Sequence, residues 1–211
     1  MSELCTQAPA DIGVPRHGPV VLTTSVGAAI GSKAAAAALA CAASEADRAG
    51  LLIELASGRA PRPALIATAA ARELEERLAV HLPQSEVASR GQLCQLTLSA
   101  DPGGLDGVAA ALPAVRDSVA VVHLPPYLLQ WALDEPRIRA TGVLLRADLG
   151  HDRSLTALTV RDLVRRGLRI AVLKQSLGWI AARRALLGAL PASGAGLPDR
   201  ARARLIGGPD A

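Results

Sequence analysis

Gly27, Gly31, Ser32 and Lys33 stand between a short apolar run and an alanine-dense stretch. A loop that cradles phosphate needs small residues, a lysine for the β- and γ-phosphates, and a Ser or Thr hydroxyl for magnesium. The pattern G-x-x-x-x-G-K-[ST] is absent here, because Ser32 follows Gly31 and Lys33 comes one place late. At a helix start, one residue turns a side chain by about 100°, and Ala34 then offers no hydroxyl. These residues therefore predict a phosphate-type loop with incomplete chemistry.

Two further titratable residues stand at the ends of other apolar runs. Glu54 lies in the run 50–55, and His123 lies in the run 119–124. The carboxyl ends of strands are where open α/β sheets bind ligands, so both residues are candidates for the same site. Each also has an ordinary interpretation, Glu54 as a solvated carboxylate and His123 as a hydrogen-bonded histidine at the sheet edge. Gly27 and Gly31, likewise, can simply let a helix pack closely on a strand.

The elements that must position these residues follow from alternating apolar runs and helical patterns. Strands alternating with helices of ten or more residues imply right-handed crossovers and a mainly parallel sheet. The sequence thus predicts one α/β domain, doubly wound, with helices flanking the sheet. We expect an irregular N-terminal lead at 1–18, the domain at 19–190 and an irregular basic tail at 191–211. Strands are expected at 19–25, 50–55, 92–99, 119–124, 141–146 and 168–173, and helices at 32–48, 66–82, 103–112, 127–133, 154–166 and 179–190.

The order of these elements resembles that of the ParA/MinD-type P-loop ATPases, which include the TadZ-like pilus-assembly proteins. The resemblance covers about residues 19–190 and is carried by VVLTTSVGAAIGSKAAAAALA, LLIELA, VVHLPP, GVLLRADLGHDRSLTALTVRDLVRRG and RIAVLKQS. It implies a phosphate loop in the first segment and a water-orienting aspartate at the end of the second. It further implies a magnesium aspartate in the third segment and a base-reading asparagine at the end of the last.

The chain departs from that family at each functional position. Ser32 stands where the phosphate lysine would be, and Lys33 stands where the hydroxyl would be. Glu54 takes the place of the water-orienting aspartate, His123 replaces the magnesium aspartate, and Lys174 replaces the asparagine. These losses together remove the groups on which phosphoryl transfer depends.

The resemblance therefore implies a pseudo-ATPase with no catalytic residue, no metal and no bound cofactor. Its degenerate nucleotide site would comprise Gly27, Gly31, Ser32, Lys33, Glu54 and His123.

Composition excludes several other classes of protein. The 211 residues are half hydrophobic, which suits one domain with a sizeable core and excludes disorder for most of the chain. Three scattered cysteines are too few for a disulfide framework or a zinc module. The N-terminus lacks the pattern of a signal peptide, and Lys33 within the apolar stretch 20–43 argues against a membrane-spanning helix. We expect a cytoplasmic protein.

Positive charge is concentrated in the C-terminal third of the chain. From His151 onward there are eleven basic and four acidic residues, a balance of +7, which leaves −3 for the first 150 residues. Such asymmetry suits nucleic acid, acidic lipid or an acidic partner. No aromatic residue interleaves with Arg161, Arg165 and Arg166, which argues against single-strand binding. We interpret these arginines mainly as the solvated faces of the last helices.

Three functional hypotheses follow. The one we favour is a non-catalytic ParA/MinD-like positioning or scaffold protein of bacterial pilus assembly, secretion or cell division. It would act through protein partners, and the resemblance implies a homodimer formed across the nucleotide site. The alternative is an ATPase with an altered loop that binds ATP with Mg²⁺, using Lys33 for phosphate and Glu54 for water or metal. A third hypothesis is a DNA-associated protein that uses the basic C-terminal third.

Overall fold

The computed structural model describes residues 18–27, 29, 31–44, 49–56, 67–83, 86–115, 118–148, 152–174 and 199–206. Within them, seven strands form one sheet in the order β3-β4-β2-β5-β1-β6-β7. Every neighbouring pair is parallel except the hairpin of β3 and β4. The predicted α/β class with a mainly parallel sheet is confirmed. The strands are β1 (Val20–Val26), β2 (Gly50–Leu55), β3 (Glu86–Arg90), β4 (Leu93–Leu98), β5 (Ala120–His123), β6 (Gly142–Ala147) and β7 (Arg169–Lys174).

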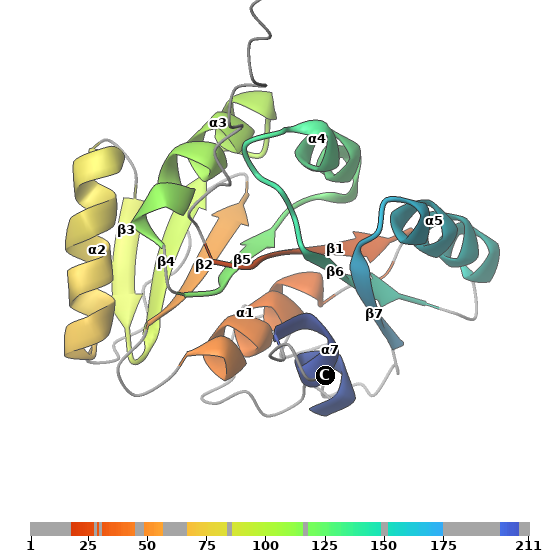
Figure 1. The fold of residues 1–211 in the computed structure, drawn as a ribbon, viewed down its shortest axis with the longest axis horizontal. Helices are drawn as coiled ribbons and strands as arrows, with labels where there is room; N and C mark the ends of the chain where they lie inside the picture. Colours follow the sequence, from red (N-terminus) through yellow and green to blue (C-terminus); the bar gives the residue numbers. More distant parts are fainter. Residues whose placement is uncertain are drawn as a thin grey trace, which may run out of the picture.

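Helices cover both faces of this sheet (Figure 1). Helices α1 and α7 pack on one face, and α2, α3, α4 and α5 pack on the other. Helices on both faces cover the apolar side chains that parallel strands present on both sides of the sheet. The helices are α1 (Ser32–Ala43), α2 (Ala69–His81), α3 (Pro102–Ala111), α4 (Leu129–Asp134), α5 (Arg153–Arg165) and α7 (Asp199–Ile206), with 3₁₀ turns η1 (Leu112–Ala114) and η2 (Pro126–Leu128).

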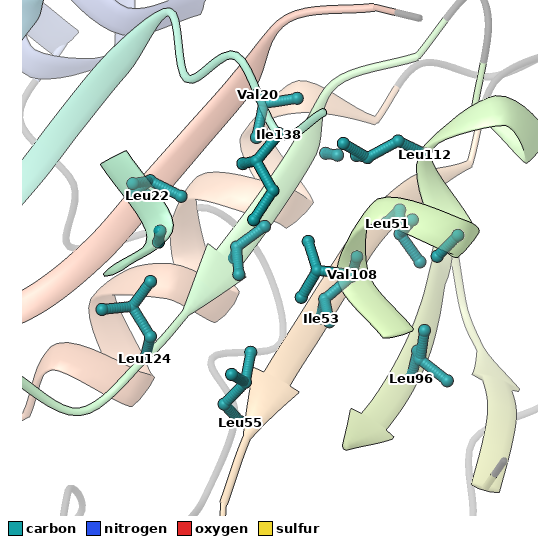
Figure 2. Packing of buried hydrophobic residues seen from close by; sticks show 14 of the residues in the cluster. Val20, Leu22, Leu51, Ile53, Leu55, Leu96, Val108, Leu112, Leu124 and Ile138 are labelled. Atoms are coloured by element: carbon teal, nitrogen blue, oxygen red, sulfur yellow. The ribbon is translucent and has the colours of Figure 1, made fainter. Parts of the chain in front are cut away.

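The hydrophobic core is divided by the sheet into two layers. Figure 2 shows part of the larger layer, in which Leu51, Ile53 and Leu96 of the strands lie near Val108 of α3 and Leu112 of η1. The smaller layer lies under α1, whose buried side chains are four alanines and Leu39. Because alanine side chains are short, α1 can lie close to the strands, and this fixes where its N-terminus meets the sheet.

Two parts of the described chain differ from the sequence-based expectation. Residues 86–90 form β3, an edge strand that we did not predict. Within the tail expected to be irregular, residues 199–206 form α7, which is anchored by the fully buried Leu205. The helix expected at 179–190 and most of the N-terminal lead lie outside the described residues.

The apolar stretch 20–43 forms β1, a turn and α1. None of the helices in the described part of the chain has the length and hydropathy needed to span a bilayer.

Candidate functional site

Three strands place polar residues side by side under the N-terminus of α1. Glu54 of β2 is in register with His123 of β5, which is in register with Thr23 of β1. Residues in register on parallel strands share one face of the sheet, and here it is the face that α1 covers. The chain leaves β1 toward α1 on this face and leaves β5 toward α4 on the opposite one. The carboxyl ends of β1 and β5 therefore form a switch point, the usual ligand position in open α/β sheets.

Lys33 and Glu54 form an ion pair at the centre of this site. The Lys33 Nζ lies 2.6 Å from Glu54 Oε1; the lysine side chain is 33% exposed and the glutamate side chain 4% exposed. Gln95 Nε2 of β4 donates a hydrogen bond of 2.9 Å to the other carboxylate oxygen, Oε2. Glu54 is thus not the solvated carboxylate of the ordinary interpretation, because both its oxygens are engaged inside the protein. A buried carboxylate needs such partners, and Lys33 supplies its counter-charge.

Ser32 and His123 form a second contact beside this ion pair. Ser32 Oγ lies 3.1 Å from His123 Nε2, within hydrogen-bonding distance. The pKa of His123 is lowered to about 4, chiefly by burial; Glu54 opposes the shift and Lys33 adds to it. The imidazole is therefore neutral near pH 7. His123 lies within hydrogen-bonding distance of Ser32, as its ordinary interpretation expects, but β5 is an interior strand and His123 stands at its carboxyl end.

The second ring nitrogen of His123, Nδ1, differs from Nε2 in its surroundings. His123 Nδ1 is buried and has no hydrogen-bond partner in the part of the chain that the structure describes. A second proton on the ring would create a buried cation, whichever nitrogen carries the first, and the lowered pKa reflects this cost. The described residues also contain no group of three or more His, Cys, Asp or Glu side chains arranged to hold a metal ion.

The lowered pKa of His123 predicts a pH-dependent stability. In the unfolded chain the imidazole takes up a proton near pH 6.5, whereas in the folded chain it does so only near pH 4. The stabilisation is complete above pH 6.5 and is lost as the pH falls toward 4, by about 3 kcal/mol in total. Urea unfolding across this range should show that loss in the wild type and a smaller loss in His123→Gln. Parallel curves for the two proteins would contradict the assignment.

The loop between β1 and α1 has two glycines in left-handed conformations. Gly27 has φ +59° and Gly31, the N-cap of α1, has φ +89°. A Cβ atom at Gly27 would lie 2.3 Å from the carboxylate of Asp152, just before α5. The close approach at Gly27 is thus to an acidic side chain from the β6–α5 connection. The Asp152 side chain therefore occupies the space beside Gly27.

The structure brings together most, but not all, of the residues singled out from the sequence. Ser32, Lys33, Glu54 and His123 are joined by the two contacts above. Lys174 is exposed at the end of β7, and β1 and β6 separate that strand from β5. Asp152, which lies against Gly27, was not predicted as part of this site.

Gln95 was not expected in the site. Its only sequence signal is the alternation of polar and apolar residues in 92–99, which places it on the same face as Glu54.

Neither a protein-family model nor a curated protein matches this chain.

Proposed function

We propose that this protein is a non-catalytic ParA/MinD-like domain that acts in the cytoplasm through protein contacts. It serves as a positioning or scaffold component of a bacterial pilus-assembly, secretion or cell-division apparatus. The observation that carries the proposal is the ion pair between Lys33 and the buried Glu54. It commits the lysine nearest the loop to an internal carboxylate.

The energetic consequence of this ion pair opposes nucleotide binding. To reach a phosphate, Lys33 would have to leave Glu54 with only the neutral Gln95 beside its buried carboxylate. Removing one partner of a buried ion pair costs about 3–5 kcal/mol. A cost of about 3 kcal/mol would weaken affinity by roughly two orders of magnitude. The Asp152 side chain also occupies the space beside Gly27.

The remaining positions support the same proposal. Phosphoryl transfer depends on a phosphate-binding cation and on ligands that hold magnesium at the β- and γ-phosphates. Here His123 occupies the place of the magnesium carboxylate, and its imidazole is neutral near pH 7. Ser32 lies within hydrogen-bonding distance of that imidazole. A site in which Lys33 contacts Glu54 and Ser32 contacts His123 suits a domain that acts through its surfaces, including a homodimer that needs no nucleotide.

Phosphate release from ATP in the presence of Mg²⁺ tests this proposal. We expect the wild type to release phosphate no faster than buffer alone, and Lys33→Ala to behave identically. Sedimentation of the wild type should also be unchanged by ATP with Mg²⁺. Release by the wild type that is lost in Lys33→Ala but kept in Lys174→Ala would overturn the proposal and favour the altered-loop ATPase. Lys174 is the suitable control because it is the chain's other lysine and lies outside the site.

A further inference from the structure

A groove of about 420 Å³ lies along the outer edge of β7. β7 is the last strand in the sheet order, and Figure 1 shows it between α5 and α7. The groove thus follows the strand edge and has a helix on either side. Its lining residues are Val160, Val164, Leu168, Ile170, Ala171, Val172, Leu173, Arg200 and Arg204.

The backbone of β7 offers hydrogen-bonding groups toward this groove. Arg169 N donates to Thr141 O just before β6, so this amide points into the sheet. Because backbone groups alternate in direction along a strand, the N–H and C=O groups of Ile170, Val172 and Lys174 point outward. No other strand of the described chain pairs with this edge. An unpaired strand edge is a template for an added strand.

The two walls of the groove differ in chemistry. On the α5 side the wall is apolar, and Val164 is 59% exposed there while Val172 of the strand is 38% exposed. On the α7 side the wall presents Arg200 and Arg204, one helical turn apart and both exposed. Neither arginine forms an ion pair with a carboxylate in the described part of the chain. An occupant must therefore be apolar toward α5 and anionic toward α7.

We propose that the β7 groove binds an extended segment of a partner protein, in which apolar and acidic side chains alternate. Successive side chains of a strand point to opposite faces. A strand added to β7 would place its apolar residues against Val160 and Val164 and its carboxylates against Arg200 and Arg204. Main-chain hydrogen bonds to β7 would supply affinity, and the two walls would supply specificity.

Charge argues for a partner protein rather than for this chain itself. Residues 175–198, which connect β7 to α7, carry Arg183 and Arg184 and no carboxylate. That segment is positively charged, like Arg200 and Arg204, so it offers no carboxylate to pair with them. A second copy pairing antiparallel through β7 would bring Arg169 of one copy near Lys174 of the other, and like charges opposed across strands are destabilising.

This inference rests on the proposed function in one respect: it names the surface through which the scaffold holds a partner. The two are nevertheless tested separately, because nucleotide assays report on the loop before α1 and the groove lies at another edge of the sheet.

The test uses a fluorescein-labelled peptide of about nine residues that alternates Val and Glu. Fluorescence anisotropy with the full-length protein should show saturable binding, and a peptide alternating Val and Lys should not bind. Arg200→Glu/Arg204→Glu should weaken binding by at least about tenfold. The matched variant Arg161→Glu/Arg165→Glu, with the same charge change on exposed α5 residues that do not line the groove, should bind like the wild type.

Hydrogen exchange provides the structural readout of the same experiment. The Val172 amide should become protected when the peptide is added, whereas Ala171, whose amide points toward β6, should change little. Equal loss of binding in both arginine variants, or protection elsewhere, would overturn the proposal.

Absence of binding would overturn it too, and two further measurements would identify the occupant. If the wild type does not bind the peptide but a variant with a Gly/Ser sequence at residues 177–190 does, the chain's own segment fills the groove. If the peptide instead dissociates a dimer in sedimentation, a second copy does.

Discussion

Replacing Lys33 with methionine is expected to lower the free energy of unfolding by about 3 kcal/mol. Methionine keeps the length and apolar stem of the side chain but removes the charge that neutralises Glu54. The Glu54 carboxylate is 4% exposed and would keep only its hydrogen bond from Gln95. The value is at the lower end of the range for a broken buried pair because Lys33 itself is one-third exposed. Equilibrium unfolding in urea at pH 7 measures it.

The partner variants of this pair test the explanation. Glu54→Gln should cost less than Lys33→Met, because the lysine that it leaves unpaired can reach water. The double variant Lys33→Met/Glu54→Gln should recover most of the stability, since no buried charge remains. Lys174→Met, at an exposed position, provides the matched control. A loss in Lys33→Met no larger than in Lys174→Met would show that the ion pair does not hold the site together.

Replacing Leu39 with alanine is expected to destabilise the protein by about 3 kcal/mol. Leu39 is fully buried and is the large side chain among the alanines with which α1 packs on the sheet. Its loss would leave a cavity between α1 and the strands, because the neighbouring alanines are too short to fill the space. The same urea unfolding measures the change, with a lower midpoint and an unchanged slope expected.

The effect of Leu39→Ala should also reach the site. Helix α1 carries Ser32 and Lys33 on its first turn, so a loosened helix should raise the hydrogen exchange of its backbone amides. Val80→Ala is the matched control, since Val80 is 80% exposed on α2 and its truncation should change stability little. If both variants unfold at the same denaturant concentration, Leu39 does not anchor α1.

The parallel strands of this fold could be predicted because their apolar runs are short and bounded by turn residues. The segments around Leu52, Val121 and Leu144 are apolar on both faces, and the structure buries them on both. β3 could not be found in this way. Its residues, EVASR, contain little apolar surface, and the strand exists because Gly91, at φ +51°, turns the chain back along β4.

α7 was missed for a different physical reason. Its sequence alternates arginine and alanine, which predicts exposed chain when it is considered alone. In the structure the helix is held by Leu205, whose side chain packs against Gly142 of β6. The contact between Leu205 and Gly142 joins segments far apart in the sequence, so no local sequence pattern could predict it.

The sequence predicted which residues form most of the candidate site, but not the contacts between them. Glu54, His123 and the loop residues were predicted because each lies at or just beyond the end of an apolar run. Ser32 and His123 are 91 residues apart in sequence, and their hydrogen bond depends on the register of β5 against β1 and on the seating of α1. The approach of Asp152 to Gly27 likewise depends on how the β6–α5 connection returns to the loop.

Titration of ATP with Mg²⁺ into the wild-type protein by isothermal calorimetry tests the central claim most directly, because it measures binding whether or not hydrolysis follows. With Lys33 held by Glu54 and Asp152 lying against Gly27, we predict no heat beyond dilution, and none in Lys33→Ala. Saturable binding by the wild type that disappears in Lys33→Ala and persists in Lys174→Ala would contradict the account. It would show that Lys33 leaves Glu54 to hold a phosphate.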